Sequence, residues 1–281
     1  MLLTLSASCI RSMFAPVRGG RGKLSVMELP DFARRTLGLH GLNVPTDLLA
    51  GLSREQLERL RDRADKAGAA CLVLVEDEAL PLGAESESVA AGAVDRLRRV
   101  VQAGQLLGCN AVTVKPSGAD APDVLQRTAE RMRKVVQGAE KIELNVLITP
   151  TEGLTASPER VTDLIKKIGG FRVGTFPDFQ AAAGSPDPVA YLRRLTPYAA
   201  VVSATTLGFV SASDGKKDPS PDDDVKHQPY DLKPLVEAIL SVGYDGTLGV
   251  DYRGAGDPTL GIVRSRKALE AMLDLEVPDE A

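Results

Sequence analysis

Short apolar runs recur along the chain, and turn residues bound each of them. The runs are apolar almost throughout instead of alternating with polar residues, which is typical of strands buried on both faces of a parallel sheet. Eight such runs are predicted to be strands, at residues 2–8, 41–46, 70–76, 111–116, 144–150, 171–178, 199–206 and 246–253.

The segments between these runs carry amphipathic patterns of good helix formers. Ser53 and Gln56 have the spacing of a capping box at the start of one segment, and Gly68 and Gly108 indicate where two helices end. Helices are predicted at residues 25–38, 53–68, 91–108, 122–139, 157–170, 187–195, 231–243 and 257–273.

A strand followed by a helix, repeated along the whole chain, favours a closed parallel barrel over an open sheet. The predicted fold class is α/β, with residues 1–281 forming a single (β/α)8 TIM barrel. The longest connection, residues 207–230 after the seventh strand, is rich in Gly, Pro, Ser and Asp and is predicted to be a mobile surface loop. It could be a lid over the site or a solvated insertion without a role, and the sequence leaves both open.

Composition and charge indicate which classes of binding partner the protein can have. With 43% hydrophobic residues, a chain of 281 residues can bury a large core. The 34 Lys+Arg and 38 Asp+Glu give a formal net charge of -4, and the basic residues are scattered, which argues against a nucleic-acid partner. The first apolar run is too short to cross a bilayer and has no basic residue before it, so it favours a strand over a signal peptide or membrane segment.

The cysteines also indicate in which cellular compartment the protein folds. Cys9, Cys71 and Cys109 are odd in number, widely spaced and set in apolar segments. They are therefore predicted to be buried free thiols, which suits a reducing cytoplasm.

Active sites of such barrels lie at the mouth, where the C-terminal ends of the strands meet the following loops. The strand ends therefore supply the candidate residues, which are Asn43, Glu76, Lys115, Thr149, Glu152, Asp178, Ser203, Thr205, Asp251 and Arg253. The carboxylates on the third, sixth and eighth strands could bind a hard divalent cation, or divide into a general acid and a general base. Lys115 could donate to a phosphate or hydroxyl group of a substrate, or simply pair with a carboxylate.

Histidine is nearly absent from the chain. His40 precedes the second strand, and His227 lies at the far end of the long connection, so neither falls at a strand end. This disfavours a zinc or manganese site built on imidazole, beyond one ligand borrowed from the loop. No Ser/His/Asp or Cys/His arrangement has supporting spacing.

Four stretches carry a resemblance to a known family, namely ELPDFARRTLGLHGLNV (28–44), LITPTEGLTASPERVTDLIKKIGG (147–170), GTFPDF (174–179) and GYDGTLGVDYRGAGDP (243–258). In these stretches and in the order in which they follow one another, the chain resembles the xylose-isomerase-like barrels. This superfamily of sugar phosphate isomerases and epimerases also includes endonuclease IV. The resemblance implies a sugar-sized pocket at the mouth. It also implies a divalent metal (Mn, Mg or Co) held by a Glu, an Asp, a His and a Glu on the fifth to eighth strands.

This chain departs from that ligand set at three positions. Asp178 matches, but Thr149 stands at the fifth-strand position, Ser203 at the seventh, and the shorter Asp251 at the eighth. Neutral hydroxyls bind divalent ions far more weakly than carboxylate or imidazole, so Asp178 and Asp251 alone would hold a metal weakly. Glu152 could replace the missing glutamate or be a surface charge.

Two functions remain open. The first is a sugar isomerase or epimerase of the cytoplasm that acts on a sugar or polyol, with no nucleic-acid or membrane partner. Its expected catalytic residues are Asp178, Asp251, Glu152 and Lys115, and its expected substrate contacts are Asn43, Glu76, Ser203, Thr205 and Arg253. The alternative is a catalytically lapsed barrel that binds a carbohydrate or a partner protein. A repair nuclease of the endonuclease IV kind is opposed by the two histidines and the acidic charge balance.

Overall fold

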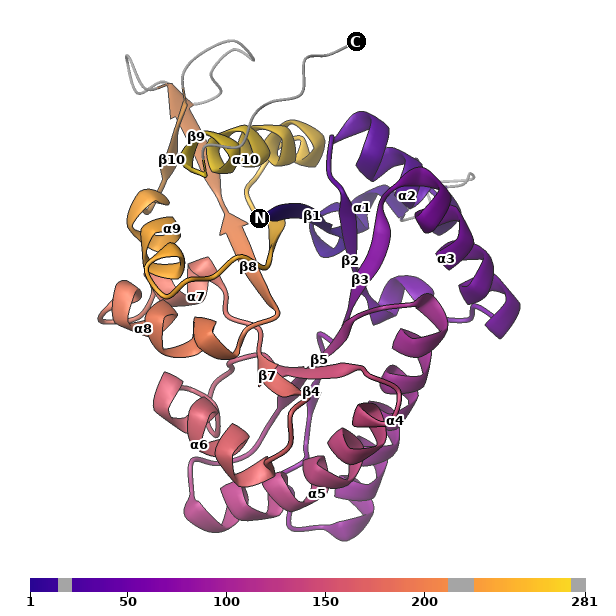
Figure 1. Cartoon of the computed structure of the whole chain (residues 1–281), viewed down its shortest axis with the longest axis vertical. Coiled ribbons are helices and arrows are strands. Elements are labelled where there is room, and N and C mark those ends of the chain that lie inside the picture. The colour runs from indigo at the N-terminus through magenta and orange to yellow at the C-terminus, as the bar shows by residue number, and fades with distance from the viewer. Residues whose placement is uncertain (15–21, 212–224, 274–281) are drawn as a thin grey trace.

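Parallel strands curl around a common axis, with helices on their outer side (Figure 1). The computed structural model describes residues 1–14, 22–211 and 225–273. Along the sheet the strands follow the order β7-β6-β5-β3-β2-β1-β11-β8, and the short β4 pairs with β5 outside this path. The bounds are β1 Leu2–Ser6, β2 Gly41–Pro45, β3 Ala70–Val75, β4 Ala79–Leu80, β5 Ala111–Pro116, β6 Asn145–Ile148, β7 Val173–Thr175, β8 Val201–Thr206 and β11 Thr247–Tyr252.

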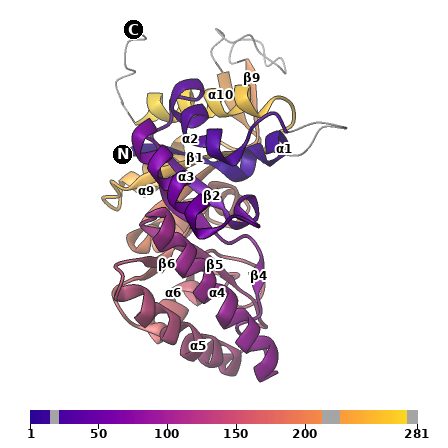
Figure 2. The same ribbon diagram turned by 90° about the vertical axis from the view of Figure 1, so that its right-hand side faces the viewer.

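Helices follow the strands and cover the outside of the sheet, as the side view also shows (Figure 2). The α-helices are α1 Arg11–Phe14, α2 Leu29–Asp31, α3 Arg54–Ala67, α4 Glu87–Leu107, α5 Pro122–Glu140, α6 Pro158–Ile168, α7 Phe179–Ala183, α8 Pro188–Leu195, α9 Lys233–Leu240 and α10 Pro258–Met272. The short 3-10 helices are η1 Ala7–Ile10, η2 Val26–Glu28, η4 Thr46–Leu49 and η5 Thr196–Tyr198, and η3 Phe32–Thr36 is a π-helix. The described helices include none with both the length and the apolar content needed to cross a bilayer.

The barrel closes between β7 and β8 without a continuous ladder. Two parallel bridges, Thr175 with Ala199 and Asp178 with Ser203, join the two edges, and the amide of Ser203 donates to the carbonyl of Pro177 at 2.8 Å. All other neighbouring strands of the barrel pair in parallel. The predicted (β/α)8 TIM barrel is therefore confirmed.

Local sequence signals set several element ends as predicted. The Ser53 hydroxyl accepts from the amide of Gln56, and the Gln56 side chain accepts from the amide of Ser53, so the capping box is present. Gly68 and Gly108 end α3 and α4 in the left-handed conformation, with φ of 70° and 73°. Glycine adopts this conformation without the steric cost of a Cβ atom, which explains both stops.

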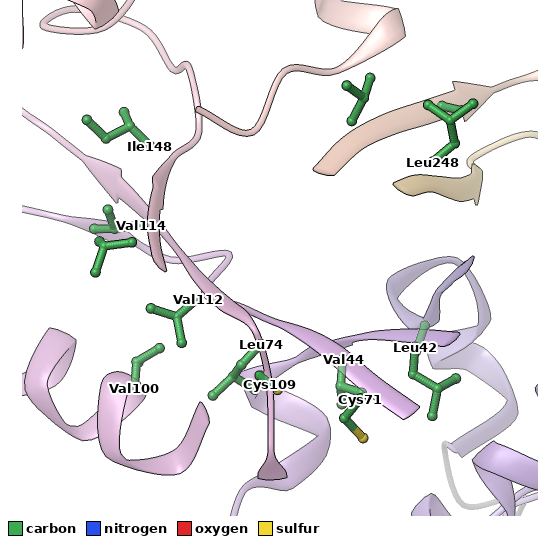
Figure 3. Close-up of a cluster of buried hydrophobic side chains, with 14 of the residues drawn as sticks. Leu42, Val44, Cys71, Leu74, Val100, Cys109, Val112, Val114, Ile148 and Leu248 are labelled. Carbon is green, nitrogen blue, oxygen red and sulfur yellow. The ribbon is translucent and has the colours of Figure 1, made fainter. Parts of the chain in front are cut away.

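The main core fills the space between the strands and the surrounding helices. Figure 3 shows part of it, with Leu42 of β2, Leu74 of β3, Val112 of β5 and Val100 of α4 among the buried side chains. Cys71 and Cys109 belong to this core, as predicted, whereas Cys9 is only half-buried, and all three thiols are free.

The segment predicted as one loop over residues 207–230 differs from that prediction at both ends. Strands β9 Gly208–Ser211 and β10 Val225–Gln228 form an antiparallel ladder, with Phe209 opposite His227. Pairing across so many intervening residues cannot be read from the local pattern. Residues 212–224 lie outside the described residues, so a lid remains a prediction, as does the single-domain organisation over 1–281.

Candidate active site at the barrel mouth

A cavity of about 320 Å³ opens at the C-terminal ends of the strands, where the barrel fold predicts an active site. Its walls come from β1, β3, β5, β7 and β11 and the residues that directly follow them. The lining residues are Ser6, Ser8, Arg11, Val75, Asp77, Lys115, Phe176, Asp251 and Arg253. Of the predicted site residues, Lys115, Asp251 and Arg253 line this cavity.

Asp178 follows β7 and begins the short helix α7. Its Oδ1 accepts a hydrogen bond from the amide of Ala181 at 2.9 Å, the usual bond of an N-cap carboxylate. Its Oδ2 accepts from the hydroxyl of Thr205 and from Nη2 of Arg253, the latter at 3.0 Å. The residue is 8% exposed, so its charge is balanced almost entirely by protein groups.

Asp251 lies near the end of β11, directly opposite Thr205 of β8. Its Oδ2 accepts from Nε of Arg253 at 3.0 Å and from Nη2 at 2.7 Å. Its Oδ1 is buried and has no hydrogen-bond partner within the described residues. Burial raises the pKa of the Asp251 carboxyl, and the Arg253 guanidinium offsets part of this effect.

Arg253 therefore joins two carboxylates from opposite sides of the β7–β8 closure, and we call these three residues the Arg253 clamp. The Arg253 Nη1 also donates to Oε1 of Gln180 on α7 at 3.1 Å. The side chain is 45% exposed, while those of Asp178 and Asp251 are 11% and 5% exposed. The guanidinium thus covers two buried carboxylates and keeps one face toward solvent.

A second charged network forms the other wall of the cavity. Asp77 accepts from Arg11 through Oδ2 and from Nζ of Lys115 through Oδ1, the latter at 3.2 Å. Arg11 also makes a two-pronged contact with Asp47, with Nε to Oδ2 at 2.8 Å and Nη2 to Oδ1 at 3.0 Å. Burial alone would raise the pKa of Asp77, but Arg11 and Lys115 outweigh it and lower that pKa. Lys115 is therefore paired with a carboxylate, the plainer of its two predicted roles.

Two hydroxyls lie beneath the clamp. Ser203 and Thr205 are two residues apart on β8 and so share the inward face, with their oxygens 3.2 Å apart. Both are buried and neither lines the cavity. Thr149, at the other predicted ligand position, has a buried Oγ1 without a partner in the part of the chain that the structure describes.

Three other predicted site residues do not line this cavity. Glu152 is exposed in the turn after β6, in line with its interpretation as a surface charge. Asn43 is buried within the barrel, where its Nδ2 donates to the Thr4 hydroxyl at 3.2 Å. Glu76 lines a neighbouring, larger cavity of about 920 Å³, which shares Arg11 and Asp77 with the first, and it is held by Nε of Arg96 at 2.6 Å. Their predicted roles in catalysis or substrate binding remain untested.

His227 is fully engaged in structural contacts. Its Nε2 accepts from the amide of Leu207 at 2.8 Å, and its Nδ1 donates to the carbonyl of Tyr230 at 2.7 Å. His40 contacts Arg34 near the surface. Among the described residues, no three His, Cys, Asp or Glu side chains converge in a way that could hold a metal ion.

Sequence reasoning missed Arg11 and Asp77. Asp77 directly follows Glu76 at the end of the third predicted strand, so its position alone could have placed it at the mouth. Arg11 lies in α1, one short turn beyond β1, in a segment where the pattern predicts no helix. Only the bend of the chain after β1 brings its guanidinium to Asp77.

Comparison with known proteins gives the family and the fold. The family model of the xylose isomerase-like TIM barrel matches residues 32–272. No curated protein matches the chain. Among solved structures, an L-ribulose 3-epimerase superposes with a TM-score of 0.74 at 13% identity, over 100% of this chain and 99% of that one.

Two further structures superpose almost as well. A D-psicose 3-epimerase in the presence of D-fructose gives a TM-score of 0.73 at 12% identity, over 96% of this chain and 98% of that one. The IOLI protein with a zinc atom gives 0.71 at 11% identity, over 99% and 100%. Identities this low support the fold alone. The family match covers most of the chain, and the chain therefore belongs to the xylose isomerase-like TIM barrel family.

Proposed function

We propose that the protein acts as an isomerase or epimerase on a small, neutral sugar or polyol held in the 320 Å³ cavity at the barrel mouth. The observation that carries the proposal is Oδ1 of Asp251, a buried carboxylate oxygen without a donor among the described residues, on a residue that lines this cavity. Leaving such an atom unpaired costs free energy, which a substrate hydroxyl would recover. The two sugar 3-epimerases that share the fold support this substrate class.

The charges around the cavity favour a neutral ligand over a phosphorylated one. Each of the three cations that line it is already paired, as Arg11 contacts Asp47 and Asp77, Lys115 contacts Asp77, and Arg253 belongs to the clamp. A phosphate group needs cations or amides that are free to bind it. A polyhydroxy compound needs only mixed donors and acceptors, which Ser6, Ser8 and the charged groups provide.

The residues suggest a division of roles. Moving a proton beside a carbonyl requires a base for the carbon-bound proton and a positive group near the oxygen that gains the electron pair. Asp251 would take the proton and return it to the neighbouring carbon in an isomerisation, whereas inversion at the same carbon would need a second proton donor on the opposite face. The Nζ of Lys115 makes two contacts with Asp77, and its third N–H would stabilise the oxygen. Asp178 is a positioning residue, because both its oxygens are engaged by Ala181, Thr205 and Arg253.

Binding without turnover is the second candidate. Two residues favour it, Thr149 and Asp251, which stand where the family has its two glutamates. Thr149 cannot act as a base near pH 7, and Oδ2 of Asp251 is held by Arg253. One experiment separates the candidates. The protein is incubated with neutral ketoses and aldoses in D₂O, with and without Mn²⁺, Mg²⁺ or Co²⁺. Proton NMR then follows exchange beside the carbonyl, and calorimetry follows binding.

The expected result is exchange and a stereoisomeric product with at least one neutral sugar, and loss of both in Asp251→Asn. Asp95→Asn is the matched control, because Asp95 is an exposed partner of Arg98 on the outer surface of α4. Binding without exchange would replace the proposal with the second candidate. Strong preference for a phosphorylated sugar, or full activity in Asp251→Asn, would refute it.

A further inference from the structure

The clamp places a positive charge between the only two acidic residues that occupy the family's ligand positions. Nη2 of Arg253 is 3.0 Å from Oδ2 of Asp178 and 2.7 Å from Oδ2 of Asp251. One nitrogen therefore bridges both carboxylates, while Nε and Nη1 fix the plane of the guanidinium against Asp251 and Gln180. A planar fork with several fixed donors makes a charge of defined position rather than a mobile one.

The donor set does not fit the divalent cation that the family resemblance implies. Such an ion needs several oxygen ligands, and its strongest ones here would be Asp178 and Asp251. Oδ2 of each is bound to Arg253, and Oδ1 of Asp178 caps α7, so Oδ1 of Asp251 is the one carboxylate oxygen of the pair without a partner in the described structure. Thr149 and Ser203 add only neutral hydroxyls.

Charge leads to the same result. A divalent ion between these carboxylates would have to displace the guanidinium or sit beside it, and two cations at such distances repel each other strongly in a half-buried site. Displacing Arg253 would also cost its four polar contacts with Asp178, Asp251 and Gln180. In both cases this repulsion or the loss of these contacts offsets most of the free energy that a divalent cation would gain from the two carboxylates.

We propose that the Arg253 guanidinium takes the place of the divalent cation at the barrel mouth, so that this chain carries its site cation as a side chain. Arg253 neutralises and orients Asp178 and Asp251 and leaves the buried Oδ1 of Asp251 without a partner among the described residues. The inference goes beyond the proposed function, because it concerns which cation occupies the site and holds whether or not turnover occurs.

The test measures metal binding directly, without any substrate. Protein purified without chelator is analysed by elemental mass spectrometry, and Mn²⁺ titrations are followed by electron paramagnetic resonance. The wild type is expected to carry no stoichiometric metal. Arg253→Ala frees both carboxylates and is expected to raise Mn²⁺ affinity by about tenfold or more, and the double variant Arg253→Ala/Asp178→Asn should lose that gain.

Two control variants make the result specific. Arg160→Ala removes the same charge from a single-carboxylate pair, with Nε 2.7 Å from Oδ1 of Asp120, and should gain no affinity. Arg253→Lys retains a cation at the clamp and should gain none either. If Arg253→Ala does not fold, the wild-type titration and Arg253→Lys still decide the matter.

The inference is overturned if the wild type binds one Mn²⁺ per chain and Asp178→Asn abolishes that binding, because Arg253 would then yield to a metal. It is also overturned if folded Arg253→Ala binds Mn²⁺ no better than the wild type, or if Arg160→Ala gains as much. A protein without turnover on any sugar would refute the proposed function and leave these metal measurements unaffected.

Discussion

Replacing His227 with Phe should weaken the attachment of the β9–β10 hairpin to the barrel. His227 is 6% exposed and packs edge-on against Phe209 and Tyr230, with ring centroids 5.4 and 4.5 Å away. A carbonyl can only accept, so Nδ1 carries the proton that binds Tyr230, and Nε2 accepts from the amide of Leu207. The Tyr230 hydroxyl in turn donates to the carbonyl of Thr205 at 2.6 Å, which connects the hairpin to the candidate site.

The expected cost follows from these contacts. Phe preserves an aromatic ring for Phe209 and Tyr230 but removes both hydrogen bonds, so the amide of Leu207 and the carbonyl of Tyr230 lose their partner. Both bonds are partly buried, so the lower end of the penalty for an unpaired group applies, about 1 kcal/mol each. His227→Phe should therefore lower the free energy of unfolding by about 2 kcal/mol near neutral pH.

The same bonds give a pH dependence of known sign. Burial lowers the pKa of His227 below its ordinary 6.5, although the bond to Tyr230 and the charge of Asp231 act in the opposite direction. The unfolded state therefore binds a proton first as the pH falls, and the stability due to neutral His227 is complete above pH 6.5 and is lost below it. Burial and the charges of Arg34 and Arg266 lower the pKa of His40 in the same way.

Urea unfolding at about pH 7.5 and about pH 5.5, followed by circular dichroism, measures this effect in the window where histidine titrates. The chain has only two histidines, so His40→Gln is the matched control that removes the other contribution. The wild type should lose stability at the lower pH, and His227→Phe should lose less of it. If His227→Phe retained the full wild-type decrease, or equalled the wild type in stability at the higher pH, the assignment of a neutral, bonded His227 would be refuted.

Two stability predictions concern local geometry. Ser53→Ala should lower the free energy of unfolding in urea by about 1 kcal/mol because it removes the capping box of α3. Ser86→Ala should change it by less than about 0.5 kcal/mol, because the Ser86 hydroxyl accepts from no amide of α4 and makes only an exposed contact with the Ser88 hydroxyl at 3.0 Å. Equal effects of the two variants would contradict this assignment. Gly174→Ala should lower the thermal midpoint because its Cβ would lie 2.3 Å from the carbonyl oxygen of Tyr198 and force the barrel edges apart. Gly138→Ala, on an exposed part of α5 with no atom near the added Cβ, should not lower the midpoint, and a similar loss in both variants would rule out closure strain.

Some elements could be predicted from the sequence because their causes are local. Apolar runs with turn residues at their ends predict strands, and the Ser53 capping box and Gly68 act within a few residues of themselves. The hairpin of β9 and β10 was missed because its strands are separated by a long segment, and no local pattern specifies which distant run will pair with Gly208–Ser211. The short helix α7 was missed because its capping carboxylate, Asp178, also ends a strand-like run.

The sequence by itself determined the alternation of eight barrel strands with helices, the family, and the placement of Asp178 and Asp251 at strand ends, because a parallel barrel converts chain order into position around a ring. Only the tertiary structure decided that Arg253 bridges those two carboxylates and that Arg11 reaches Asp77. It also showed that Glu76 and Glu152 do not line the 320 Å³ cavity. The apolar pattern of the sequence determines where each strand ends. The partners of a long charged side chain depend instead on which neighbouring strands lie within its reach, and on the cost of leaving a buried charge unpaired.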